Sequence, residues 1–149
     1  MKLTEHFTLE ELIFSETAIR HGLDNTPNED VIDNLRLLAS HLEEVRSLLG
    51  VPIIISSGYR CPALNRAVGS KDTSAHVQGL AADFTAPAFG SPLKICQEIR
   101  DCSAIRFDQL IHEFGTWVHF GVAVAPRREL LTIDQDGTRS GLLSVRMVA

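Results

Sequence analysis

The ten residues Ser74-Ala-His-Val-Gln-Gly-Leu-Ala-Ala-Asp83 decide how we expect this chain to fold. They place His76 and Asp83 seven residues apart, with one glycine and two alanines among the residues between them. A second histidine in a distinctive context, His119, follows in the segment Trp117-Val-His-Phe-Gly121. Two imidazoles and one carboxylate form a three-ligand set suited to Zn²⁺, with water in the fourth position. We therefore expect a fold that brings these three side chains together.

The spacing of these residues leaves two interpretations open, because a histidine followed by an aspartate seven residues later is common by chance. In the first, His76 lies at a loop or strand end and the chain folds back through Gly79 to place Asp83 beside it. In the second, the three residues are a surface histidine, an aspartate in a turn and a histidine that caps a strand. A domain without metal belongs to the second interpretation.

Alternating patterns predict the strands that would carry two of these residues. Residues 80–84 predict a strand in which Asp83 lies on the face opposite Leu80, Ala82 and Phe84. Residues 107–114 and 117–124 predict a β-hairpin around Gly115-Thr116. The second arm of the hairpin alternates between a core face and a cleft face, and the cleft face carries Trp117, His119 and Gly121.

The remaining sequence predicts helices and short strands around this centre. Thr8-Leu-Glu-Glu11 is a capping box, so a short helix is expected after it, with His21 and Gly22 at its edge. Further patterns predict a long amphipathic helix at 31–49 closed by Gly50, a buried strand at 51–55, helices at 63–68 and 93–99, and a hairpin at 130–148 about Asp136-Gly137. The expected fold class is α+β, with a small antiparallel sheet packed against helices.

Composition and charge narrow the classes of protein. The chain has 149 residues, 44% of them hydrophobic, which suits one domain spanning residues 1–149. A net charge of −5 disfavours nucleic acid as a partner, and no apolar run approaches the roughly 20 residues of a membrane span. The N-terminal segment is polar from its start and does not predict a signal peptide. Three cysteines, Cys61, Cys96 and Cys102, lack metal-type spacing and are expected to be reduced thiols.

Several segments taken together resemble the D-alanyl-D-alanine carboxypeptidase family of zinc peptidases, which shares its fold with the hedgehog signalling domain. The first is Ser-x-His at 74–76, with Asp83 seven residues after the histidine and a later Trp-x-His at 117–119. The family also carries Ser-Gly-Tyr-Arg, here residues 57–60, followed by an asparagine, here Asn65. Segments at 6–12 and 107–114 are similar to a phage- or prophage-type branch. The resemblance implies a hedgehog-like fold with zinc in a cleft over the sheet.

The resemblance also implies roles for individual residues. The expected ligands of one Zn²⁺ per chain are His76, Asp83 and His119. Arg60 would hold a substrate carbonyl or carboxylate, because a guanidinium stabilises oxyanion charge, and the alternative is a salt bridge to a nearby acid. The other expected substrate contacts are Ser74, which is otherwise a plain loop serine, and two cleft-wall residues, Tyr59 and Trp117.

The general base is where this sequence departs from the family pattern. Many members place Asp or Glu three residues before the last histidine, and Thr116 stands there in this chain. We expect Glu113 to act instead, with His112 as the alternative. The hairpin register decides between them. A three-residue loop places Glu113 opposite Trp117 on the face of His119, whereas a two-residue loop places His112 opposite His119.

The function implied by the resemblance is zinc-dependent hydrolysis of an amide bond in peptidoglycan stem peptides, at D-Ala-D-Ala or L-Ala-D-Glu bonds. The alternative is a catalytically silent, zinc-stabilised binding or structural domain of the same fold. We expect a monomer that is made in the cytoplasm and acts on the cell wall when phage machinery delivers it, in the manner of an endolysin. The same polar N-terminus is equally compatible with a cytoplasmic protein that never contacts the cell wall.

Overall fold

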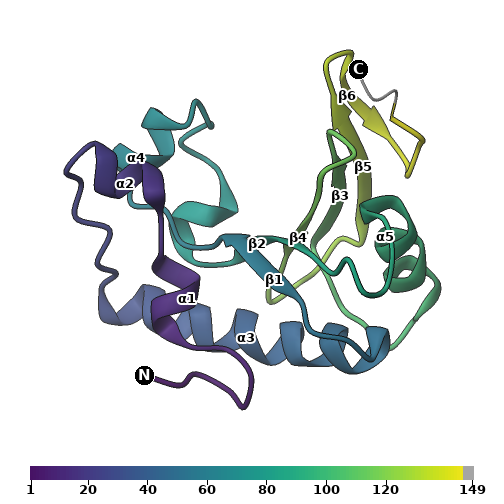
Figure 1. The fold of residues 1–149 in the computed structure, drawn as a ribbon, viewed down its shortest axis with the longest axis horizontal. Coiled ribbons are helices and arrows are strands. Elements are labelled where there is room, and N and C mark those ends of the chain that lie inside the picture. Colours follow the sequence, from purple (N-terminus) through teal and green to yellow (C-terminus); the bar gives the residue numbers. More distant parts are fainter. Residues whose placement is uncertain (146–149) are drawn as a thin grey trace.

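A six-stranded sheet forms the centre of the protein, with the strand order β1-β2-β4-β3-β5-β6 (Figure 1). The computed structural model describes residues 1–145. The strands are β1 (Ile54–Ser57), β2 (Ala81–Thr85), β3 (Gln109–Glu113), β4 (Trp117–Gly121), β5 (Glu129–Asp134) and β6 (Gly137–Ser140). The expected α+β class is confirmed.

One pair of strands differs from the expected antiparallel sheet, because β3 and β5 run parallel. The end of β4 and the start of β5 both lie beside Gln109, with which Gly121 and Glu129 are paired. The loop 122–128 therefore crosses that end of β3 from one side to the other, and the chain reverses there, so β5 runs opposite to β4 and parallel to β3. The four other neighbouring pairs are antiparallel.

Five α-helices and one 3₁₀ helix surround the sheet within the described residues. They are α1 (Leu9–Ile13), α2 (Glu16–Arg20), α3 (Glu29–Leu49), α4 (Pro62–Ala67), η1 (Ala75–Gln78) and α5 (Pro92–Asp101). Thr8 caps α1 as expected, but Phe14 is extended and Ser15 caps a second helix. The single short helix expected near the N-terminus is therefore wrong: a second cap breaks it in two.

The hydrophobic core is built from one face of α3, the inner face of α5 and the core-facing side of the sheet. The buried residues of α3 recur at helical spacing, and the helix ends at Gly50 in the left-handed conformation, as expected. In Figure 1, α3 runs along the bottom of the view and α5 covers the part of the sheet that carries β3. The core residues of the central strands include Ala82, Phe84, Leu110, Val118 and Phe120.

Two strands have boundaries that differ from the expected ones. The strand expected at 51–55 begins later, at Ile54, and extends to Ser57. The C-terminal hairpin turns between Asp134 and Gly137, and β6 ends at Ser140, while the predicted second arm reached Val148, which lies outside the described residues. No described helix is both long and apolar enough to cross a membrane.

Candidate metal centre

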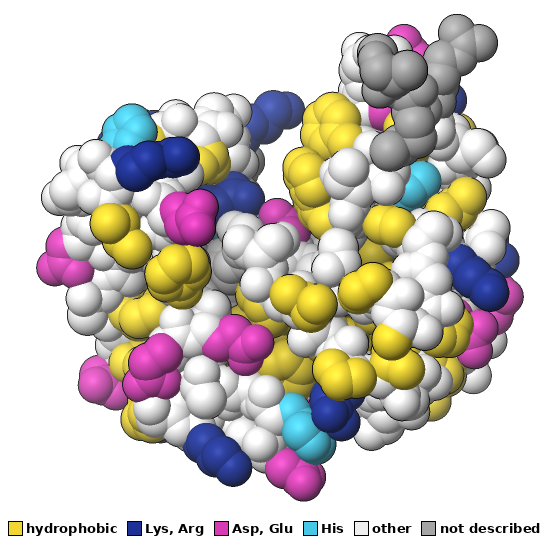
Figure 2. All heavy atoms as spheres, viewed as in Figure 1, with side chains coloured by type: hydrophobic (Ala, Val, Ile, Leu, Met, Phe, Trp, Pro, Cys, Tyr) yellow, Lys and Arg dark blue, Asp and Glu magenta, His cyan; other side chains and the backbone are white. Residues whose placement is uncertain are grey.

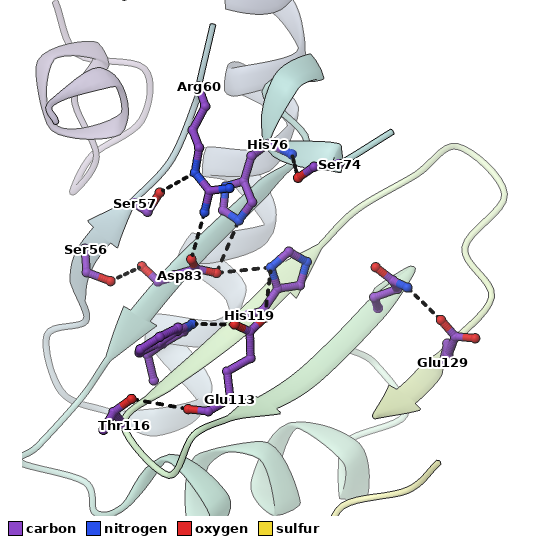
Figure 3. A network of polar contacts seen from close by, with 12 residues as sticks. Ser56, Ser57, Arg60, Ser74, His76, Asp83, Glu113, Thr116, His119 and Glu129 are labelled. Atoms are coloured by element: carbon purple, nitrogen blue, oxygen red, sulfur yellow. Dashed lines mark hydrogen bonds and ion pairs between the residues drawn. The ribbon is translucent and has the colours of Figure 1, made fainter. Parts of the chain in front are cut away.

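The pairing of β2 with β4 places Asp83 directly opposite His119. Residues opposite each other in an antiparallel pair project to the same face, so the carboxylate and the imidazole meet above the sheet. His76 reaches the same point from η1, the 3₁₀ helix that leads into β2 (Figure 3). All three side chains are buried, with exposed fractions of 2% for His76, 5% for Asp83 and 7% for His119.

The distances among these side chains fit a metal ion. His76 Nε2 lies 3.3 Å from Asp83 Oδ1, and His119 Nδ1 lies 3.1 Å from the same oxygen. One ligand atom from each residue falls within 4.8 Å of the others. Tetrahedral zinc with bonds of about 2.0–2.2 Å separates its ligand atoms by about 3.3–3.6 Å. The donor set and its spacing therefore fit three ligands of a tetrahedral zinc ion.

Two backbone hydrogen bonds hold His76 in place. Its Nδ1 donates to the carbonyl of Gly58 at 2.7 Å, and the His76 carbonyl accepts from Arg60 N–H at 3.0 Å. A carbonyl can only accept, so Nδ1 carries the proton and the Nε2 lone pair faces Asp83. Gly58 is required here, because a Cβ at that position would lie 2.2 Å from the Leu12 carbonyl oxygen. Gly79 ends η1 in the left-handed region, with φ +73°.

The protonation states suit metal binding, which needs neutral histidine and ionised carboxylate. Burial lowers the pKa of His76 and so favours the neutral imidazole. Burial acts in the opposite sense on Asp83, but the two neighbouring imidazoles outweigh it and hold the pKa of that carboxyl well below its ordinary value. His76 and Asp83 thus favour the two states that bind a metal ion, a neutral imidazole and an ionised carboxylate.

Glu113 lies beside this cluster, in the register expected for a three-residue turn. Glu113 is paired with Trp117 and Ile111 with His119, so the Glu113 side chain shares the face of His119. Its Oε1 lies 3.9 Å from His119 Nδ1, and its Oε2 accepts from Trp117 Nε1 at 3.0 Å. Burial, followed by the charge of Asp83, raises the pKa of Glu113. His112 points to the other face, where its Nδ1 contacts the Leu143 carbonyl at 2.9 Å.

A family model described as peptidase M15 matches residues 5–121, about four fifths of the chain. The chain belongs to the peptidase M15 family. This family comprises zinc peptidases of the D-Ala-D-Ala carboxypeptidase type, and membership implies a metallopeptidase. The match includes the three clustered residues and Glu113, while β5 and β6 of this M15 chain follow it. No curated protein matches the chain.

Arg60 of this M15 protein forms the ion pair that the sequence offered as the alternative to a substrate contact. Its Nη2 lies 3.5 Å from Asp83 Oδ2, so the ion pair to a nearby acid is present. Nε donates to Ser57 Oγ at 3.2 Å and Nη1 to Asn65 Oδ1 at 3.1 Å. The buried Asn65 is itself fixed by a 2.8 Å bond to the Lys71 carbonyl. These contacts hold the guanidinium beside Asp83, where it also forms part of the cleft wall.

The cleft beside the cluster of His76, Asp83 and His119 has a volume of about 520 Å³. Arg60, Asp83, Tyr59 and Trp117 line it, and Figure 2 shows the surface hollowed between the part carrying α2 and α4 and the part carrying the β3–β4 hairpin. The two aromatic residues are therefore where the sequence predicted them. Ser74 is not among the lining residues; its Oγ accepts from His76 N–H at 3.3 Å and caps η1.

One wall of the cleft was not predicted from the sequence. It is formed by α2 and the two residues before it, namely Phe14, Ser15, Glu16, Thr17 and Arg20. The available signal was Ser15, whose Oγ accepts from Ala18 N–H at 3.1 Å as a helix cap. A second cap only a few residues after the first indicates that a new helix begins there, rather than one continuous helix.

Proposed function

We propose that this M15 protein hydrolyses an amide bond in peptidoglycan stem peptides, at a D-Ala-D-Ala or an L-Ala-D-Glu linkage. The observation that carries the proposal is the position of Glu113, a partly buried carboxylate 3.9 Å from His119 Nδ1 and hydrogen-bonded to Trp117, which lines the cleft. It supplies the acid–base group that Thr116 cannot supply, because a hydroxyl does not accept the proton of a water near neutral pH. The Thr116 hydroxyl instead donates to the Glu113 carbonyl at 3.3 Å.

The residues that would hold zinc are His76, Asp83 and His119, because their donor atoms and spacing fit that ion. A zinc ion bound there supplies Lewis-acid chemistry, which activates water and polarises the scissile carbonyl. The surrounding residues prepare the site before any substrate arrives. Gly58 sets the tautomer of His76, and the Arg60 guanidinium faces the outer oxygen of Asp83.

Glu113 transfers protons in the proposed reaction, and Arg60 stabilises the negative charge that develops. Oε1 of Glu113 takes a proton from the attacking water and later delivers it to the leaving amine. Burial favours this role, because it raises the pKa of the carboxyl and so increases its proton affinity. Arg60, fixed by Ser57 and Asn65, offers a guanidinium to the charge that develops on the substrate carbonyl oxygen.

Arg20, on the opposite wall of the cleft, predicts a contact with a carboxylate of the substrate. Arg20 lines the cleft from α2, and its Nη2 contacts Thr17 Oγ1 at 3.4 Å. An Arg20→Ala variant is expected to raise KM for a stem peptide with free carboxylates about two- to fivefold, with kcat unchanged, because exposed ion pairs are weak. Steady-state kinetics test this, with Arg36→Ala on α3 as the control. An unchanged KM would remove Arg20 from the binding surface.

Digestion of purified muropeptides tests the proposed reaction. Zinc-loaded protein is expected to release either D-alanine or a fragment with a new D-Glu amino terminus, which mass spectrometry distinguishes by mass. The product also identifies the bond that is cut. If no linear or cross-linked stem peptide is cleaved at any protein concentration, the catalytically silent domain becomes the better account, and the departure from the family pattern at Thr116 supports it.

The proposal also covers the number of domains, the oligomeric state and the route to the cell wall. The described core residues form one cluster that joins α3, α5 and the sheet, which supports a single domain over residues 1–149. We propose that the protein acts as a monomer on the cell wall, delivered by phage machinery. Size-exclusion chromatography with light scattering tests the oligomeric state directly.

A further inference from the structure

Phe114, at the turn between β3 and β4, has an unusual backbone. Its φ is 54°, in the left-handed region that bulky side chains rarely adopt, and Gly115 beside it also has positive φ. The Phe114 N–H donates to the Ile133 carbonyl at 2.8 Å, and Thr116 N–H donates to the Glu113 carbonyl at 3.0 Å. Such a conformation persists only where surrounding contacts hold it, and it indicates that the ring serves a purpose at this place.

The Phe114 ring packs against Trp117, and Trp117 in turn contacts Glu113. The ring centroids of Phe114 and Trp117 lie 5.6 Å apart with planes inclined at 45°, although 43% of Phe114 stays exposed. Trp117 Nε1–H donates to Glu113 Oε2 at 3.0 Å. The other oxygen, Oε1, is left to face His119 Nδ1 at 3.9 Å. Three side chains of one hairpin are thus linked in series.

We propose that Trp117 and Phe114 are positioning residues for Glu113, an inference that rests on the proposed function. The indole N–H assigns one carboxylate oxygen to a fixed hydrogen bond and leaves the other free to receive a proton. The phenyl ring prevents the indole from turning into the cleft, which Trp117 also lines. A carboxylate held in one orientation needs no reorganisation when water approaches, and such placement is worth more in turnover than in substrate affinity.

Kinetics of two variants test the inference. Trp117→Phe keeps a ring but loses the donor, and we expect kcat to fall about tenfold to a hundredfold with KM changed much less, as for a lost hydrogen bond to a charged group. Phe114→Gly is expected to lower kcat by a smaller factor although glycine suits the backbone there, and Phe114→Tyr should recover most of that loss. Val124→Ala, at an exposed loop residue, serves as the control with unchanged turnover.

A second measurement is independent of turnover, because Trp117 is the only tryptophan in the chain. Its indole N–H gives one cross-peak in a ¹H–¹⁵N correlation spectrum. We expect Glu113→Ala to move that peak upfield, and Phe114→Gly to speed its exchange with water. If wild-type protein cleaves no stem peptide, the proposed function fails. If it cleaves, but Trp117→Phe retains full kcat or Glu113→Ala leaves the indole peak in place, the positioning inference fails.

Discussion

A His76→Ala variant is expected to lose stoichiometric zinc, falling from one ion per chain in the wild type to a trace after gel filtration. His76 contributes one of the three donor atoms, and its Nε2 lies 3.3 Å from Asp83 Oδ1. Losing an outer partner of a ligand already weakens metal affinity 10- to 100-fold, so losing the ligand itself should cost more than about a hundredfold. Elemental analysis and competition with a chelator of known affinity measure the loss.

The matched control for this experiment is His21→Ala, because His21 is exposed and follows the last residue of α2. This variant should bind one zinc per chain with wild-type affinity. Circular dichroism of both variants establishes that each is folded when its metal content is measured. Retention of one tightly bound zinc by folded His76→Ala would show that the ion binds elsewhere.

A Glu113→Gln variant is expected to keep its zinc and lose turnover. The glutamine amide has nearly the shape of the carboxylate, and its carbonyl oxygen can still accept from Trp117 Nε1, but it cannot take a proton from water. General acid–base catalysis contributes about 10²- to 10⁴-fold in rate, so kcat should fall by a factor in that range with KM nearly unchanged. Muropeptide hydrolysis under saturating substrate measures the effect.

His112→Gln separates Glu113 from the alternative base that the sequence left open. His112 lies on the far face of β3 and contacts the Leu143 carbonyl, so its replacement should leave kcat within about twofold of wild type. The reverse outcome, with His112→Gln inactive and Glu113→Gln active, would mean that the hairpin in solution has the other register. Equal activity of both variants with wild type would remove the acid–base role from this hairpin.

Strand periodicity was sufficient to predict which side chains share a face. The alternation in β2 and β4 placed Asp83 and His119 away from the core, and the structure pairs them directly. Periodicity cannot set the register between two strands, because sliding one strand changes its partners without changing its own alternation. For that reason the alternation alone does not choose between Glu113 and His112, whereas the three-residue turn places Glu113 on the face of His119.

The features that sequence reasoning missed depend on contacts between distant segments. The parallel pairing of β3 with β5 follows from the path of the loop 122–128, which has no local signature. The cleft wall from α2 exists because the chain turns at Phe14 and places Arg20 in the same cleft as Arg60. The sequence offered Arg60 an ion pair with a nearby acid but could not identify that acid, because Asp83 belongs to a different segment of the chain.

X-ray absorption at the zinc edge of the wild-type protein tests the central claim most directly. If His76, Asp83 and His119 hold the ion, the spectrum should show two imidazoles among nitrogen and oxygen scatterers at about 2.0–2.1 Å, and no sulfur shell. The Asp83→Ala variant gives the matched sample for the loss of the carboxylate ligand. A sulfur shell at about 2.3 Å would assign the ion to cysteine instead and would contradict the buried His-Asp-His zinc centre.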